Sequence, residues 1–220
     1  MAVGGEPVVL GVDPGLTRCG LGVVAGPSSR PRVRWHDCVR TAPNVPLEQR
    51  LLIVHDAILD AVAEHRPSAV AVERVLFSGN ARTAMATGQA AGVALLAAAR
   101  SGLPVTSYSP NEVKQTVAGS GSADKHAVAR LVAAQLGLAE LPKPADVADA
   151  LAVALTHLAR DRMAAAVRGT AAADSLAEAD AAARSASQGG WEAVLGDRIP
   201  PASTPGSHRS PVRGSTGRRR

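Results

Sequence analysis

Residues 8–24 read "VVLGVDPGLTRCGLGVV", two apolar runs divided by an Asp-Pro-Gly turn sequence. Asp is favoured at the start of a turn, Pro fixes φ at the next position, and Gly supplies a positive φ after it. The stretch therefore predicts a hairpin with strands at 8–12 and 18–25. Asp13 directly follows the first strand, and on this segment alone its carboxylate is explained as part of the turn.

The rest of the chain predicts a third strand of this meander and then helices alternating with strands. Further strands are predicted at 32–41, 67–75 and 103–109, and helices at 47–65, 80–100, 123–137 and 145–162. Another helix begins with Ser109 as N-cap, Pro110 at its first position and Glu112 two residues later, the pattern of a capping box. This order is typical of an α/β domain with a five-stranded mixed sheet flanked by helices.

The composition divides the chain near residue 165. We expect one domain at 1–165, followed by a basic tail at 166–220 whose Pro, Ser, Gly and Arg content predicts disorder. The formal net charge of +5 favours a polyanionic partner, although part of that charge lies in the tail.

Two features predict where the protein resides. Cys19 and Cys38 lie in predicted strands without metal-ligand spacing, so they are expected to be thiols in a reducing compartment. The start of the chain lacks the pattern of a signal peptide, and the run "AAGVALLAAA" is about half the length that crosses a bilayer. We therefore expect a cytoplasmic protein with no membrane contact.

Four acidic residues stand where the predicted elements could bring them together. Asp13 and Glu73 end buried strands, while Asp146 and Asp149 lie three residues apart on the last helix. Taken singly, Glu73 is explained as a solvated strand end, and either Asp as a favourable partner of the helix dipole.

Two carboxylates about 4 Å apart repel by about 4 kcal/mol at an effective dielectric of 20. A convergence of four would need a cation such as Mg²⁺ or Mn²⁺.

Four motifs give the chain a specific resemblance. From about residue 8 to 163 it resembles the RuvC family of Holliday-junction resolvases, and the matching motifs are "LGVDPG" at 10–15, "AVERV" at 71–75, "VKQTVAGSGSADK" at 113–125 and "ADVADALAVALTH" at 145–157. The resemblance implies a ribonuclease-H-like fold. It also implies an endodeoxyribonuclease that resolves four-way DNA junctions in recombination and repair by paired symmetric nicks, leaving 5′-phosphate ends.

The resemblance also implies the roles of individual residues. It makes Asp13, Glu73, Asp146 and Asp149 a catalytic tetrad that binds two Mg²⁺ ions, for which Mn²⁺ can substitute, and it places Lys114 and Lys125 near the scissile phosphate. The implied DNA contacts are Leu76, Phe77, Asn80, Arg82, Gln89, Lys114, Gln115 and Lys125.

The chain departs from the family pattern at several implied DNA contacts. Where the family often has a Phe that stacks at the junction centre, this chain has Leu76 with Phe77 next to it, so that either Phe77 takes the stacking role or its ring faces the core and Leu76 stands at the junction centre. Ala91 replaces a usual Arg, and His126 a usual Gln. His157 lies about 16 Å along the helix axis from Asp146, too far to share its metal.

The resemblance implies a homodimer that works with a branch-migration complex of the RuvA and RuvB type. Three alternatives remain at this point: an actin-like ATPase or sugar kinase, because "GVDPGLTRCGLGVV" resembles their first phosphate-binding loop; a non-catalytic junction-binding module; and a related nuclease with other substrates. The ATPases need two domains and this chain has room for one.

Overall fold

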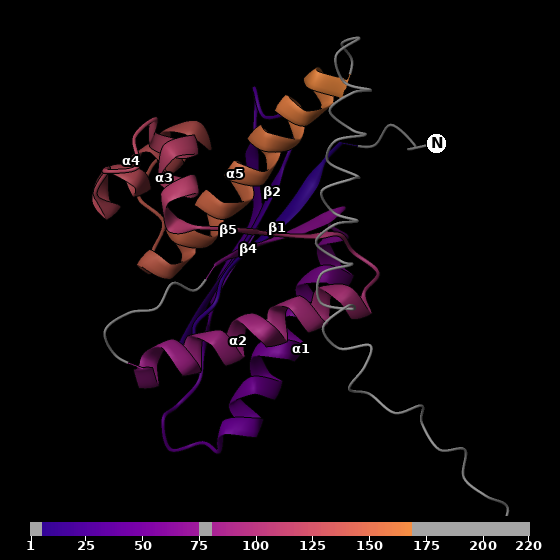
Figure 1. Ribbon diagram of the computed structural model, residues 1–220, viewed down its shortest axis with the longest axis vertical. Helices are drawn as coiled ribbons and strands as arrows, with labels where there is room; N and C mark the ends of the chain where they lie inside the picture. Colours follow the sequence, from indigo (N-terminus) through magenta and orange to yellow (C-terminus); the bar gives the residue numbers. More distant parts are fainter. Residues whose placement is uncertain (1–5, 75–80, 169–220) are drawn as a thin grey trace, which may run out of the picture. The chain divides into compact units, whose positions relative to one another are not determined.

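The computed structural model describes residues 6–74 and 81–168, with the side chains of 165–168 excepted (Figure 1). Its strands are β1 (Val8–Asp13), β2 (Arg18–Ala25), β3 (Arg32–Arg40), β4 (Ala69–Glu73) and β5 (Val105–Tyr108). Its helices are α1 (Leu47–His65), α2 (Ala81–Arg100), α3 (Pro110–Ala118), α4 (Lys125–Gln135) and α5 (Ala145–Arg168). The predicted capping box is present at the start of α3, where Ser109 and Glu112 bond each other's backbone N–H groups.

The strands form the mixed sheet that the sequence predicts, in the order β3-β2-β1-β4-β5. The first three strands are an antiparallel meander, whereas β4 and β5 run parallel to β1. Val12 lies opposite Val72. The residues that follow them, Asp13 and Glu73, therefore lie beside each other where these two inner strands end. The parallel pairing of β1 and β4 thus brings together two carboxylates that are 60 residues apart in the chain.

Alternate residues of β1 face two different helix layers. Leu10 and Val12 point into a core shared with α1 and α2, which lie together on one side of the sheet. Val9 points to the opposite face, which α5 covers together with α3 and α4 (Figure 1). Because side chains alternate along a strand, Gly11 and Asp13 lie on the same face as Val9 and look toward α5.

Glycines on this second face let the backbone of α5 touch the sheet. A Cβ atom at Gly11 would lie only 2.0 Å from the carbonyl oxygen of Ala150, and one at Gly20 only 1.9 Å from that of Asp146. At Gly22 it would lie 2.7 Å from a methyl carbon of Leu151. Gly11 pairs with Gly22 and Asp13 with Gly20, so the three glycines lie next to one another on the sheet, beside Asp13. We call them the glycine track. The first turn of α5 is therefore fixed next to the end of β1.

Most elements differ by one or two residues from the bounds that the sequence predicts, and two differences bear on the site. β4 covers Ala69–Glu73, within the predicted 67–75. Helix α5 continues to Arg168, past the predicted end at 162. Leu158 is the last buried apolar residue among the described side chains of α5, and the residues from 160 to 164 are exposed. The apolar periodicity therefore ends before the helix does. The helix continues through an Ala-rich segment whose intrinsic helix propensity is high.

The structure describes both cysteines and all the predicted helices. Cys19 and Cys38 are free thiols, and burial raises the pKa of Cys19 to about 12. Within 6–74 and 81–168, no helix has the length and apolar character needed to cross a bilayer. The expected tail lies almost wholly outside the described residues, so the boundary at 165 stays a prediction.

The glycine track predicts a pronounced effect of one methyl group. Gly11→Ala should lower the free energy of unfolding by about 3 kcal/mol or more, because the new Cβ would have to displace the backbone of α5. The matched control is Gly92→Ala on α2, where a Cβ would meet nothing within 4 Å. Because Ala has a higher helix propensity than Gly, this substitution should raise the free energy of unfolding by about 0.5–1 kcal/mol. Denaturant unfolding of both variants measures the difference, and an equal stability would contradict the backbone contact.

Candidate active site

Asp13 and Glu73 form the centre of an acidic cluster at the end of the sheet. Burial, followed by the charges of Glu73 and Asp149, raises the pKa of Asp13 to about 8. Burial also raises the pKa of Glu73, and a side-chain hydrogen bond with Asp13 opposes that shift. At neutral pH the pair therefore holds a proton that two solvated carboxylates would not keep.

Helix α5 adds the other two carboxylates from its first two turns. Asp146 stands directly over Gly20, whose missing side chain leaves room for the carbonyl of Asp146. The charges of Asp146 and Asp149 both contribute to the raised pKa of Asp13, and that of Asp149 also acts on Glu73. The four acidic residues expected from the sequence thus lie together, although they come from three separate elements.

Cationic side chains lie on both sides of the cluster. Lys125 Nζ is 3.1 Å from Asp149 Oδ2, and the charge of Asp149 raises the pKa of that lysine. The charge of Lys114 also acts on Glu73. On the other side, Arg18 Nε is 3.2 Å from Asp146 Oδ2. The negative charges of the site are therefore partly compensated by the chain itself.

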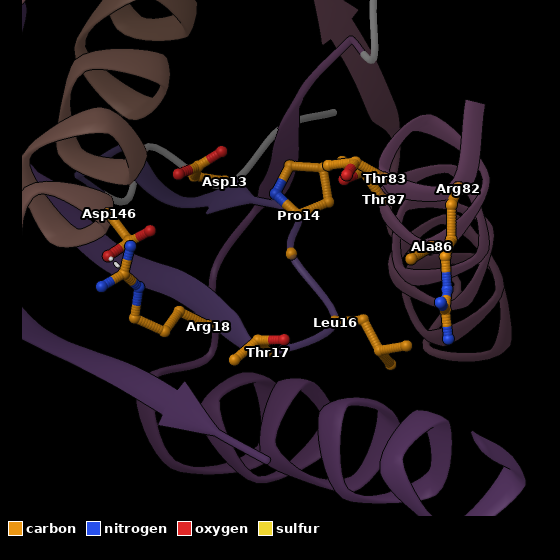
Figure 2. Close-up of a pocket in the computed structure, with 11 residues that line it drawn as sticks. Asp13, Pro14, Leu16, Thr17, Arg18, Arg82, Thr83, Ala86, Thr87 and Asp146 are labelled. Carbon is orange, nitrogen blue, oxygen red and sulfur yellow. Dashed lines mark ion pairs between the residues drawn. The ribbon is translucent and has the colours of Figure 1, made fainter. Parts of the chain in front are cut away.

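Cavities lined by described residues flank the carboxylates. One of about 540 Å³ lies between the β1–β2 loop and the first turns of α2, and Figure 2 shows Asp13 and Asp146 on the side opposite Arg82 and Thr87. The other, of about 50 Å³, is lined by Glu73, Asp149, Lys114 and Lys125 among others. The larger, open cavity lies beside Asp13 and Asp146, and the small one brings both lysines to Glu73 and Asp149.

The donor set fits a hard divalent cation. Asp146 Oδ2 is buried and receives no hydrogen bond from the described residues, and burial beside Glu73 raises the pKa of Asp13 to about 8. Among those same residues, no three Asp, Glu, His or Cys side chains are already drawn together as ligands of one ion. Carboxylate oxygens are the ligands that Mg²⁺ and Mn²⁺ prefer, and such an ion would replace the proton and satisfy the buried oxygen.

The expected DNA contacts are distributed over three parts of the chain. Lys114 and Gln115 lie on α3, and the Gln115 amide bonds the backbone of Gly119 and Gly121, which orders the loop before Lys125. Arg82 lines the open cavity from α2, and Gln89 lies half-buried two turns further along that helix. The remaining expected contacts, Leu76, Phe77 and Asn80, lie outside the described residues.

His157 belongs to a separate buried network. Its Nδ1 lies 2.9 Å from the hydroxyl of Tyr108, and its Nε2 lies 3.2 Å from Asp161. Burial lowers the pKa of His157, while the charge of Asp161 opposes this shift. Tyr108 is only 4% exposed, so its ring is not available to stack on a base. The network joins β5 to α5 and agrees with the expectation that His157 does not share the metal.

Sequence reasoning missed Arg18 and the residues that support its loop. Arg50, on α1, donates to Thr41 and Thr17, and the Thr41 hydroxyl donates to the Leu16 carbonyl. The only signal in the sequence is that Arg18 begins the strand that pairs with β1, two residues before the glycine opposite Asp13. Arg50 and Thr41 lie far from that motif and give no such signal.

Comparisons with known proteins agree on one family. The family model described as "Crossover junction endodeoxyribonuclease RuvC" matches residues 9–157. A protein of that name from Salinispora arenicola is 53% identical over 164 residues, which cover 72% of this chain and 93% of that protein. One from Leifsonia xyli is 47% identical over 188 residues, or 84% of this chain and 90% of that protein.

A solved structure shows the same likeness in three dimensions. T. thermophilus RuvC, solved in complex with a Holliday junction substrate, is 44% identical to this chain, with a TM-score of 0.69. The match covers 71% of this chain and 96% of the solved one.

The buried carboxyl pair predicts a pH-dependent stability. Because the folded-state pKa of Asp13 lies above its ordinary value of 3.8, its stabilising contribution is complete below about pH 4 and is lost as the pH rises toward 8. Asp13→Asn does not titrate, so in EDTA its melting temperature should exceed that of the wild type by about 5 °C at pH 8 and by much less at pH 5.

Calorimetry at the two pH values measures this effect. Asp60→Asn, at an exposed position of α1, is the control and should show the same difference from the wild type at both. Mg²⁺ should raise the melting temperature of the wild type at pH 8 more than that of Asp13→Asn. A pH-independent offset for Asp13→Asn would contradict the buried proton.

Proposed function

The chain belongs to the family of crossover junction endodeoxyribonuclease RuvC, and on that premise we propose that it resolves four-way DNA junctions by hydrolysing one phosphodiester bond in each of two opposed strands. The likeness to T. thermophilus RuvC confirms the ribonuclease-H-like fold expected from the resemblance. The observation that carries the proposal is the cluster of Asp13, Glu73, Asp146 and Asp149 with a lysine pair beside it.

In this proposal the four carboxylates hold two divalent ions, Mg²⁺ or Mn²⁺. When bound, the ions would supply an activated water as nucleophile and neutralise charge on the leaving 3′ oxygen, which gives 5′-phosphate products. Asp13 and Glu73 must lose their shared proton before they can act as ligands, since only carboxylates bind such ions. Lys114 and Lys125 are held where a cation can offset the negative charge that develops on the phosphate.

The proposed DNA contacts surround the carboxylates. Arg82 supports this because it borders the open cavity next to Asp13, and Gln89 follows on the same helix. Gln115 acts by ordering the loop that leads to Lys125. Leu76, Phe77 and Asn80 belong to the segment that links β4 to α2, and we retain Phe77 or Leu76 as the side chain that stacks at the junction centre.

We further propose a homodimer in the cytoplasm, working with a branch-migration complex of the RuvA and RuvB type. Exposed apolar side chains on the two adjacent helices support self-association: Leu52 and Ile53 of α1, and Leu95 and Leu96 of α2, are each more than 40% exposed. A two-fold symmetric pair of sites would suit paired nicks in a two-fold symmetric substrate.

The other candidate functions have less support. An actin-like ATPase or sugar kinase would require nucleotide between two domains, and the RuvC match takes up the same residues that would form the first of them. A purely binding module would not need all four acidic residues, each of which this chain retains. No specific observation favours either of them.

The central test is a cleavage assay on a synthetic four-way junction. Asp13→Asn should lower the Mg²⁺-dependent cleavage rate by about 100-fold or more and leave junction affinity within about threefold, because it removes a metal ligand and no phosphate contact. Asp60→Asn should cut at the wild-type rate. Linear duplex and RNA–DNA hybrid serve as substrate controls, and cleavage by Asp13→Asn at the wild-type rate would contradict the assignment.

The expected domain boundary has its own test. A protein that ends after Arg168, where α5 ends, should melt within about 2 °C of the full chain and cut a junction within about threefold of its rate. The tail lacks core-forming periodicity, so its removal should cost no packing. Insolubility or loss of cleavage in the shortened protein would show that residues 169–220 take part in folding or catalysis.

A further inference from the structure

Arg18 occupies a position next to the metal-binding carboxylates that the catalytic roles above do not use. Its Nε lies 3.2 Å from Asp146 Oδ2, the same buried oxygen that receives no hydrogen bond from the described residues. The Arg18 side chain is 59% exposed, whereas that of Asp146 is 18% exposed. The contact is an ion pair, and more than half of the Arg18 side chain remains accessible to a second anionic partner.

Arg18 also stands between two cavities. The cavity of about 540 Å³ beside Asp13 and another of about 440 Å³ share Thr17 and Arg18 as lining residues, as seen for the first of them in Figure 2. Arg82 borders the first cavity, and Arg40 borders the second. Together the two cavities form a path lined by three arginines, and neither cavity is lined by Lys114 or Lys125.

The backbone that carries Arg18 is held in place. Thr41 N–H donates to the Thr17 carbonyl at 3.1 Å, and the Thr41 hydroxyl donates to the Leu16 carbonyl. Arg50 Nε donates to Thr41 Oγ1 at 2.7 Å, and its terminal nitrogen to Thr17 Oγ1 at 3.0 Å. Since α1, the β1–β2 loop and the residue after β3 are tied together, movement at this place is confined to the long side chain of Arg18.

We propose that Arg18 is a switched DNA ligand: it compensates Asp146 when no metal is bound, and it moves to a backbone phosphate of the cleaved strand when a divalent ion takes that carboxylate. This inference rests on the proposed function and adds a phosphate subsite in the paired cavities. This subsite is separate from the small cavity that the lysine pair lines. Arg18 is a positioning and binding residue that leaves the chemistry to the carboxylates.

The charge balance explains the exchange. A divalent ion satisfies the buried oxygen of Asp146 better than a guanidinium at its edge, because a doubly charged ion binds the carboxylate directly. The released guanidinium then lies in a cavity whose other cations, Arg40 and Arg82, already favour an anionic ligand. Arg binds phosphate with its planar fork of donors, so the same side chain suits both partners.

The test compares Arg18→Gln with Arg30→Gln, a control that removes the same charge at the opposite end of the sheet. Binding of Mn²⁺ to the full-length protein without DNA is measured by titration calorimetry. Arg18→Gln should bind the ion about 3–10-fold more tightly than the wild type, because a competing cation is gone. Arg30→Gln should bind it like the wild type.

Junction binding is measured by fluorescence anisotropy over a range of salt, once in EDTA and once in Ca²⁺, with a gel to check that the junction stays intact. In Ca²⁺, Arg18→Gln should lose about 5–10-fold in affinity and about 0.9 in the slope of log affinity against log salt, the value for one phosphate contact. In EDTA the slope should equal that of the wild type. Arg18→Lys, which keeps the charge, should restore the slope in Ca²⁺.

Each contrary result has a distinct meaning. Equal loss of slope in EDTA and Ca²⁺ would make Arg18 a permanent phosphate contact and overturn the switch. Behaviour like that of Arg30→Gln in both assays would overturn the phosphate subsite as well. A wild-type protein that bound no four-way junction in either buffer would instead overturn the proposed function, and the metal titration would then still report whether Arg18 competes with the ion.

Discussion

The backbone contact between α5 and the glycine-bearing face of the sheet is the constraint on which the site depends. Gly11 and Gly20 face the carbonyl oxygens of Ala150 and Asp146 with no room for a side chain. On an ordinary strand, Val or Leu at these positions would hold the helix several ångströms further away. The close approach places the first turns of α5 beside Asp13, so that acidic residues from the two ends of the domain's sequence act on one another.

The acidic cluster that results is unfavourable by itself, and the chain compensates it in three ways. Asp13 and Glu73 retain a proton, Asp149 faces Lys125, and Asp146 faces Arg18. Each compensation can be undone, because a proton can leave and both cations sit on long, exposed side chains. In the proposed function a bound divalent ion would relieve the repulsion that the fold imposes on these carboxylates.

The lysine side of the site is attached to α5 by a second set of contacts. The hydroxyl of Tyr108, at the end of β5, pairs with His157, and Arg160 lies over the Tyr108 ring and 3.3 Å from Glu112. Glu112 in turn completes the capping box that starts α3, the helix that carries Lys114. Helix α5 therefore fixes both the carboxylates and the helix that brings a lysine to them.

The sequence by itself determined the order of elements, the mixed sheet, the capping box and the family, because periodicity, turn residues and motif spacing are local properties of the chain. It also placed the four acidic residues at strand ends and on one helix, and the resemblance to the RuvC family assigned them to one site. Only the tertiary structure decided that burial raises the pKa values of Asp13 and Glu73, that Arg18 compensates Asp146, and that Arg50 and Thr41 hold the loop of Arg18. Those facts depend on the register between β1 and β4 and on the depth at which α5 packs, and both are set by contacts between residues far apart in the chain.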